Sequence, residues 1–209
     1  TMCFSAGVSF VASAGLAVLG GVSLKVARKE ERIIAFIPIA FAIQQALEGI
    51  QWFALGRGCI SFLSGYGFLF FALVFWPIYV PLAVYILDKK KRKILRWFVG
   101  LGACLSSFFL FLLLTEPLSI ASVNQSISYN FRIPFDYLAT LLYMSVIVLP
   151  LLVSSHHMFR LLALAVTFLG FFTAVFFFET FISVLCFFSA IISMLCFFYL
   201  KRKIPNVLK

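Results

Sequence analysis

The sequence predicts an all-α fold, a polytopic membrane bundle of seven transmembrane helices with its N-terminus outside and its C-terminus inside. Three observations predict it. Of the 209 residues, 64% are hydrophobic, only 11% are charged, and the basic residues gather in short clusters between long apolar runs. An ordinary soluble domain is nearer half apolar and a quarter charged. A soluble core of this size is too small to hide so much apolar surface.

Apolar runs separated by charged or turn residues predict seven spans within one transmembrane domain, residues 1–209. The predicted spans are 4–24, 33–55, 61–87, 94–115, 133–153, 159–178 and 181–200. Each is close to the roughly 20 residues that cross a hydrocarbon core of about 30 Å. The last two are separated only by Glu179 and Thr180. Because the apolar stretch is twice as long as one crossing, a tight turn is expected at these two residues.

The first run is expected to stay in the membrane as a span. No basic segment precedes it and a charged cluster follows it, which is the reverse of a removable signal peptide. Met2 is the expected start of translation, and Thr1 is set aside. Serines spaced by four residues and several glycines predict close approach of another helix. These small residues are Ser5, Ser9, Ser13, Gly15, Gly20 and Gly21.

The second run carries a dense set of polar side chains. These are Gln44, Gln45, Glu48, Gln51 and the adjacent Trp52. At about 100° per residue they fall within an arc of roughly 120°, so they share one helix face. Glu48 is expected roughly 10 Å below the interface, where an ionisable group is costly unless it is protonated, paired or hydrated. The face is a candidate binding site, although a carboxyl that ties neighbouring helices together fits the same pattern.

The third run contains Trp76-Pro77 and Pro81, which predict a kink, because a proline ring removes a backbone N–H and collides with the preceding turn. A kink this deep needs neighbours or water to satisfy the freed carbonyls, and such kinks often border cavities. Trp76 is therefore included among the candidate ligand-binding residues. Glu116 ends the fourth run, where the helix dipole disfavours an anion. A cation, a metal ion or a hydrated pocket is therefore expected beside Glu116.

The longest loop, 116–132, joins the fourth and fifth runs. Its stretch Ile127–Ile133 alternates apolar with polar residues. Such alternation predicts a short half-buried strand, which is expected to form a small lid.

The basic residues set the predicted orientation. All but two of the 17 Lys and Arg residues fall on one side of the spans, and the two exceptions are Arg57 and Arg132. The positive-inside rule then puts the N-terminus outside. The formal charge of +10 is thus explained by anchors that contact membrane lipids, and nucleic-acid binding is not expected. Four acidic residues fall in the outer half, namely Glu48, Glu116, Asp136 and Glu179.

Cys3 is the second candidate, because it lies at the outer end of the first run, on the side toward which the Glu48 face opens. If Met2 is removed, Cys3 carries a free amine and a thiol, a pair that can ligate a soft metal or act as a nucleophile with its own base. A metal ion at Cys3 and Glu48 is the cofactor that the sequence suggests. An ordinary interfacial cysteine, or one bridged to Cys59 in an oxidising compartment, fits equally.

Three segments give the chain a resemblance to a bacterial family of uncharacterised multi-pass membrane proteins. They are Met2-Cys3-Phe-Ser-Ala6, Gln44-Gln45-Ala-Leu-Glu48-Gly49-Ile-Gln51-Trp52 and Trp76-Pro77-Ile-Tyr-Val-Pro81. The similarity runs over most of the length. The resemblance implies that Cys3, Glu48, Trp52 and the Trp-Pro element matter together, and the bacterial inner membrane is the expected location. The family has no assigned reaction, so the function stays open.

Three functions fit these observations. The leading hypothesis is a protein that binds a small ligand or metal ion in an outward-opening intramembrane pocket, for sensing or transport. Its candidate ligand-binding residues are Gln44, Gln45, Glu48, Gln51, Trp52, Trp76 and Glu116. No deep ionisable residue continues a path through the inner half, so a pocket closed at its inner end fits better than a conducting path.

The alternative is an intramembrane hydrolase or transferase that acts on a lipid-like substrate. In it, Cys3 is the nucleophile or metal ligand and Glu48 is the acid/base. The sequence lacks HExxH, GxSxG and a spaced set of histidines, which are typical of several hydrolase classes. A structural or assembly subunit is the third hypothesis.

Overall fold

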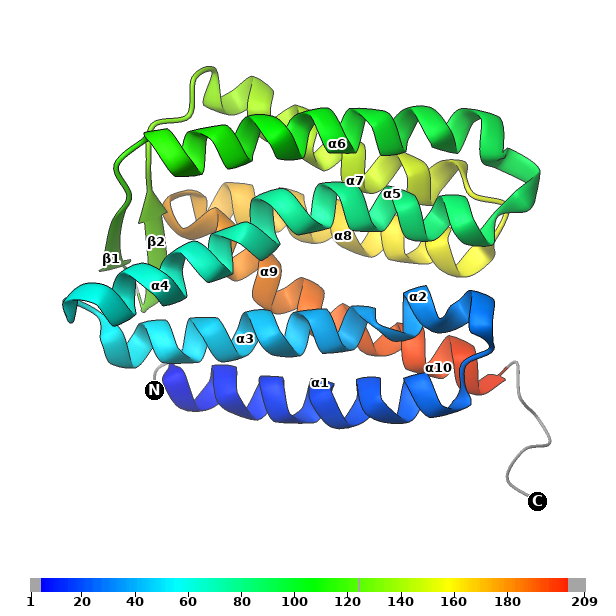
Figure 1. Ribbon diagram of the computed structural model, residues 1–209, viewed down its shortest axis with the longest axis horizontal. Coiled ribbons are helices and arrows are strands. Elements are labelled where there is room, and N and C mark those ends of the chain that lie inside the picture. The colour runs from blue at the N-terminus through cyan, green and yellow to red at the C-terminus, as the bar shows by residue number, and fades with distance from the viewer. Residues whose placement is uncertain (1–4, 124, 203–209) are drawn as a thin grey trace.

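The computed structural model of the chain describes residues 5–123 and 125–202, the last two by their backbone alone. In this part of the chain, seven helical runs are long and apolar enough to cross a membrane. They lie side by side along the long axis of the bundle (Figure 1). The runs are Ala6–Val26, Lys29–Ala54, Gly58–Leu87, Lys89–Thr115, Asp136–Val153, His157–Phe176 and Phe178–Leu200. Each overlaps one of the runs predicted from the sequence.

Short breaks divide some of these runs into separate helices. The helices are α1 Ala6–Val26, α2 Arg32–Ala35, α3 Ile37–Ala54, α4 Gly58–Leu69, α5 Trp76–Leu87, α6 Arg92–Thr115, α7 Asp136–Val153, α8 His157–Phe176, α9 Phe181–Ile192 and α10 Met194–Arg202. The predicted tight turn between the last two spans is present as a 3-10 turn, Phe178–Thr180.

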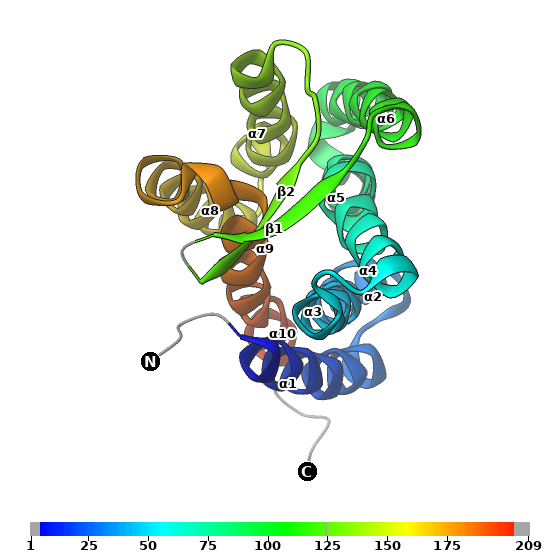
Figure 2. The ribbon, with the colours of Figure 1, turned by 90° about the vertical axis from the view of Figure 1, so that its left-hand side faces the viewer.

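The two ends of the bundle differ in charge. One end, here the hairpin end, holds the β-strands and the α3–α4 and α8–α9 corners, whereas the opposite end holds the α5–α6 and α7–α8 corners (Figures 1 and 2). The Lys and Arg residues of the described chain gather at the opposite end, here the basic end, with Arg57 and Arg132 as the exceptions. The helix packing therefore separates the charges as the sequence predicted.

Large apolar side chains cover the outside of the bundle. Leu114, Trp97 and Phe171 are 76%, 72% and 71% exposed, respectively. Patches of this kind are rare on soluble monomers, where they would contact water. Lipid tails are as apolar as these side chains, so the same patches are stable in a membrane. The surface therefore agrees with a multi-pass membrane protein.

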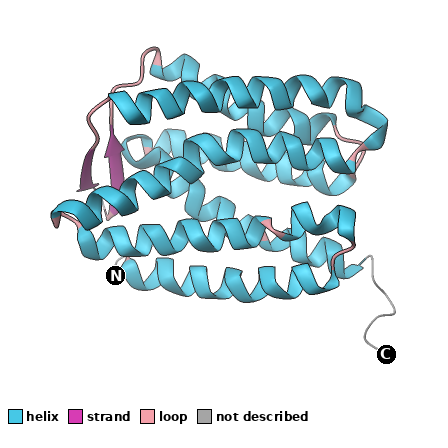
Figure 3. Ribbon diagram, viewed as in Figure 1, coloured by secondary structure: helices cyan, strands magenta, loops and turns pink. Residues whose placement is uncertain are grey.

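A hairpin interrupts the otherwise helical chain between α6 and α7 (Figure 3). Its antiparallel strands are β1, Ser119–Val123, and β2, Ser126–Asn130. In its register, Ser119 lies opposite Asn130 and Val123 lies opposite Ser126. The strand predicted from the alternation is thus present, but it ends at Asn130 because β1 offers no partner beyond Ser119.

Helices α1 and α3 pack closely, as the small residues predicted. A Cβ atom added at Gly20 would lie 2.4 Å from Cγ1 of Ile39. The Ser13 hydroxyl donates a hydrogen bond of 2.8 Å to the Ala42 carbonyl. By contrast, Gly15 and Gly21 face open space. The close approach therefore depends on Gly20 alone among the three glycines.

The third run bends where the prolines predicted a kink. Residues Phe70–Phe75 form a π-helical turn between α4 and α5, and Pro77 lies in the first turn of α5. The wider turn gives the proline ring room that a regular helix lacks. Two carbonyls of this turn accept side-chain hydrogen bonds of 2.7 Å, from Tyr143 to Ala72 and from Ser106 to Val74.

The second proline opens a contact between α5 and α6. Pro81 has no N–H to donate to the Pro77 carbonyl, which lies four residues earlier in the helix. Gly102 of α6 packs directly against that oxygen, since a Cβ added at Gly102 would lie 2.0 Å from it. The missing side chain of Gly102 is thus what lets the two helices meet.

Asp88 joins two corners at the basic end. Its Oδ1 accepts hydrogen bonds from the Lys90 and Lys91 amides at 3.1 and 3.3 Å. Its Oδ2 accepts from the Ser154 hydroxyl at 3.0 Å and the Ser155 amide at 2.6 Å. Burial alone would raise the pKa of Asp88, but these hydrogen bonds outweigh burial and hold the pKa below its usual value.

Replacing Asp88 with Ala is expected to lower the free energy of unfolding by about 1–3 kcal/mol, because the buried Ser154 hydroxyl and three partly buried backbone amides lose their acceptor. Since the folded pKa of Asp88 lies below its unfolded value, its stabilisation is full above about pH 4 and is lost as the pH falls through the folded pKa. Thermal unfolding in detergent at pH 3–8 checks both. Asp136→Ala, at an exposed carboxyl, is the control, and equal losses in the two variants would contradict the role of Asp88.

Candidate functional site

The polar face of α3 points into the bundle. Gln44, Gln45 and Gln51 are completely buried and Glu48 is 3% exposed. The buried part of α3 lies between α1, α4 and α9. The face predicted from the helical spacing is therefore an interior face.

Glu48 is held by groups from two helices. The Gln45 side-chain amide donates to its Oε2 at 3.2 Å. The Ser183 hydroxyl of α9 donates a short hydrogen bond to its Oε1. Tyr129 of β2 and Cys186 of α9 also lie within electrostatic range of the carboxyl group. Elements far apart in the sequence thus meet at this one carboxyl.

Gln44 connects this cluster with the Trp-Pro element. Its Oε1 accepts a 2.8 Å hydrogen bond from Nε1 of Trp76. The indole stacks on Phe41, with ring centroids 4.0 Å apart. The Gln44 amide also lies near the Cys186 thiol without forming a hydrogen bond of acceptable geometry. The structure therefore brings together two segments that the resemblance had linked.

Gln51 has a separate set of partners. Its Nε2 donates to the Ser61 hydroxyl and its Oε1 accepts from the Ser64 hydroxyl, both at 2.7 Å. Both serines belong to α4. Gln51 therefore ties α3 to α4, and its side-chain nitrogen and oxygen each already have a partner.

Unpaired polar atoms surround Glu48. Among the described residues, five buried side-chain polar atoms have no hydrogen-bond partner, and three of them are Gln44 Nε2, Gln45 Oε1 and the Tyr129 hydroxyl. Native proteins leave few buried polar atoms unpaired. Unused donors and acceptors on residues near one carboxyl make this group the candidate binding site. We name Gln44, Gln45, Glu48, Tyr129 and Ser183 the Glu48 cluster.

The hairpin covers this cluster. Tyr129 stacks on Phe68 of α4 at 4.9 Å, and the Ser128 hydroxyl donates to the Glu179 carbonyl at 2.9 Å. The strand was predicted to be half-buried, but Ser126–Tyr129 are buried on both faces, because β2 lies between α4 and the α8–α9 corner. Burial, followed by the charge of Glu48, raises the pKa of Tyr129 well above its usual range, so its hydroxyl keeps its proton. The hairpin thus lies at the end of the bundle toward which the sequence predicts the pocket to open, and the outward opening stays a prediction.

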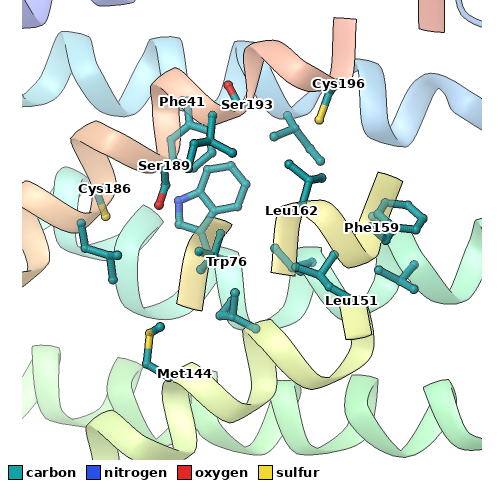
Figure 4. Close-up of a pocket in the computed structure, with 18 of the residues that line it drawn as sticks. Phe41, Trp76, Met144, Leu151, Phe159, Leu162, Cys186, Ser189, Ser193 and Cys196 are labelled. Atoms are coloured by element: carbon teal, nitrogen blue, oxygen red, sulfur yellow. The ribbon is translucent and has the colours of Figure 1, made fainter. Parts of the chain in front are cut away.

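A central cavity of about 100 Å³ lies inside the bundle next to the cluster, since its wall includes Trp76, the hydrogen-bond partner of Gln44. Its wall is mostly apolar and includes Trp76 and Tyr143. Figure 4 shows Ser189 beside the indole of Trp76, with Cys186 one turn away on α9. Apolar walls with a few convergent polar groups are typical of small-molecule sites.

The other predicted residues lie at the edge of the cluster or beyond it. Trp52 is half-buried and packs against the hydrophobic residues around Phe68. Glu116 caps the end of α6 where the chain turns toward β1, and it is half-buried. None of the hydrogen bonds described for Glu48 comes from either residue.

The metal prediction depends on a residue that the structure leaves undescribed. Cys3 lies outside the described residues, so neither its distance from Glu48 nor a bridge to the exposed Cys59 is defined. Within the described part of the chain, no three His, Cys, Asp or Glu side chains come together as metal ligands do. A metal at Cys3 and Glu48 therefore stays a prediction.

Sequence reasoning missed Tyr129, Ser183 and Cys186. The signal was present in the last run as a polar side chain every three or four residues, at Ser183, Cys186 and Ser189 of α9, at Ser193 after its end and at Cys196 of α10. This spacing marks one helix face. Tyr129 shares the apolar side of the alternating strand with Ile127, so only its hydroxyl is polar there. Without a fold, nothing indicated that α9 and β2 would meet at Glu48.

Comparison with known proteins gives one match. Residues 2–208 match the model of a family of unknown function, DUF6629. No curated protein and no solved structure matches the chain.

Proposed function

The chain belongs to DUF6629, a family of unknown function, and we propose that it is an integral membrane protein that binds a small ligand or ion at the Glu48 cluster, for sensing or transport. The observation that carries the proposal is the group of unpaired atoms Gln44 Nε2, Gln45 Oε1 and the Tyr129 hydroxyl around a buried carboxyl. A carboxyl kept only to tie helices together gives no reason for three unpaired neighbours.

We further propose that the hairpin end faces outward and the basic end faces the cytoplasm. The described clusters at Lys25–Arg32 and Lys89–Arg96 and the single Arg160 support this orientation, because cytoplasmic loops are enriched in Lys and Arg. The Glu48 cluster then lies in the outer half of the membrane. The bacterial inner membrane is the location that this charge pattern and the resemblance favour.

The chemistry of the cluster favours a guest that both donates and accepts hydrogen bonds, or a small cation held by oxygen atoms. Gln45 Oε1, the Tyr129 hydroxyl and the Glu48 carboxyl supply oxygen atoms, and Gln44 Nε2 supplies a donor. If the guest is a metal ion, we propose that Cys3 adds a thiol ligand. Helix α1, which follows Cys3 in the sequence, begins at the hairpin end of the bundle.

Ligand binding fits the central cavity better than ion conduction does. Of the described residues that line this cavity, none is charged. Conducting and alternating-access proteins usually place ionisable or carbonyl groups along the path. We therefore favour sensing, with the guest held between the cluster and the cavity.

The intramembrane enzyme is the second candidate, and one contact favours it. The Ser183 hydroxyl donates to Glu48, which is how a hydroxyl nucleophile meets its general base. In this form Ser183, in place of Cys3, attacks an ester carbonyl of a lipid-like substrate, Glu48 takes the hydroxyl proton and passes it to the departing alcohol, and water then releases the acyl group from Ser183. An enzyme of this kind should be labelled at Ser183 by a fluorophosphonate, whereas a pure binding protein should stay unlabelled.

The proposed function can be tested with protein purified into nanodiscs. Thermal unfolding is measured with Na⁺, K⁺, Mg²⁺ and Zn²⁺ and with membrane lipids, and native mass spectrometry detects any copurified molecule. At least one probe or copurified molecule is expected to raise the unfolding temperature of the wild type and to lose its effect in Glu48→Gln. Ser106→Ala, which removes a buried hydrogen bond elsewhere, should keep the effect. Absence of any bound molecule or shift in the wild type would contradict the proposal.

A further inference from the structure

Three cavities with shared wall residues lead from the lipid-facing surface to Cys186 of α9. A groove of about 560 Å³ lies between α6 and α7. A small cavity of about 50 Å³ lies behind it and shares Ala139 with the groove. The small cavity shares Tyr143, Leu185 and Cys186 with the central cavity. Neighbouring cavities therefore share side chains in their walls.

The groove has the shape and surroundings of a hydrocarbon-chain site. On α6 it runs from Phe98 to Phe108, about 15 Å of helix. Its other wall includes Leu138 and Leu142 of α7, which are exposed on the outside of the bundle. Because both helices are long and apolar enough to cross a membrane, the groove opens toward lipid. One chain lying along the helices fits this space.

Ala139 stands where the groove meets the interior. It lies near the start of α7, in contact with the hydrophobic residues around Phe109, and its methyl group faces both the groove and the small cavity. Beyond it lies Cys186, which is about one helical turn along α9 from Ser183, whose hydroxyl donates to Glu48. The hairpin lies over the cluster at its end of the bundle, and Ile127 of β2 is fully buried.

We propose that the guest of the Glu48 cluster is a single-chain membrane amphiphile with a neutral, hydroxyl-bearing head, which enters sideways between α6 and α7. The inference rests on the proposed function. The chain stays in the groove while the head passes Ala139 and reaches the cluster. A hydroxyl head both donates and accepts, so it matches both the unpaired donor Gln44 Nε2 and the unpaired acceptor Gln45 Oε1. An ammonium head has nothing for Gln44 Nε2 to donate to, and an anionic head is repelled by Glu48.

Monoolein is a suitable probe because it joins one chain to a hydroxyl-bearing head. Native mass spectrometry and thermal unfolding are measured in detergent with monoolein, glycerol, oleylamine and oleic acid. Monoolein is expected to bind the wild type saturably, whereas glycerol, which lacks the chain, should have no effect. Ala139→Phe is expected to weaken monoolein binding at least tenfold, because the ring fills the passage.

Two further variants separate a blocked passage from a damaged fold. Ala103→Phe adds the same ring to an exposed position of α6 that lines none of the three cavities, and it should bind monoolein as the wild type does. Ala139→Met, whose flexible side chain is easier to accommodate, should weaken binding less than Ala139→Phe while unfolding at the wild-type temperature.

The outcomes distinguish this inference from the proposed function. If glycerol alone or an ion binds through Glu48 and Ala139→Phe has no effect, lateral entry is wrong and ligand binding stands. Stronger binding of oleylamine or oleic acid than of monoolein would overturn the neutral head. If nothing binds the wild type, both proposals fail.

Discussion

Replacing Gly102 with alanine is expected to destabilise the bundle by about 3 kcal/mol, an overpacking cost at the upper end of the usual range. The added Cβ would lie 2.0 Å from the Pro77 carbonyl oxygen and 3.0 Å from its carbon. Backbone atoms cannot rotate away as a flexible side chain can. Helices α5 and α6 must separate instead, which loosens a contact that extends along both.

The control for this prediction lies on the same helix. A Cβ added at Gly100 has nothing within 4 Å, so Gly100→Ala should be neutral or should raise stability by up to about 1 kcal/mol through helix propensity. Thermal unfolding in detergent measures both variants. Equal unfolding temperatures for Gly102→Ala and Gly100→Ala would show that α5 and α6 do not meet at the Pro77 carbonyl.

Substitutions at Glu48 are expected to separate stability from binding. Glu48→Ala leaves the Ser183 hydroxyl and the Gln45 amide without their acceptor, and it should lower the free energy of unfolding by about 2–3 kcal/mol. Glu48→Gln keeps one acceptor oxygen and nearly the same volume, so its loss should stay below about 1 kcal/mol. Both variants should lose the bound guest, because alanine removes the carboxyl group and the amide of glutamine presents a different set of donors and acceptors.

The two readings of Glu48 differ in the behaviour of the glutamine variant. If the carboxyl only ties helices together, Glu48→Gln folds, and no probe changes the unfolding temperature of either the wild type or the variant. If it forms a site, Glu48→Gln folds but no longer shifts its unfolding temperature with the probe that stabilises the wild type. Measuring unfolding with and without that probe, for the wild type and both variants, decides between them.

The helical runs were predictable because a bilayer imposes one length and one composition on every span. The run 61–87 shows the limit, since it was read as one helix with a proline kink. In the structure the residues before Pro77 widen into a π-helical turn. Composition cannot specify this, because the turn is stabilised by Tyr143 and Ser106, which approach from other helices.

The candidate site was predictable on one helix and unpredictable across helices. The spacing of Gln44, Gln45 and Glu48 placed them on one face, and the structure buries that face. Their partners Ser183 and Tyr129 are more than 80 residues away in the chain, so only the packing of α9 and the hairpin brings them to Glu48. Helical periodicity describes each helix alone and carries no information on which faces meet.

The central claim is that the Glu48 cluster holds a guest, and an experimental structure in lipid nanodiscs tests it most directly. If the claim holds, non-protein density lies beside Glu48, within hydrogen-bond distance of Gln44 Nε2, Gln45 Oε1 or the Tyr129 hydroxyl. The claim would be contradicted by a well-resolved cluster without such density, in which these three atoms hydrogen-bond to one another or to neighbouring side chains.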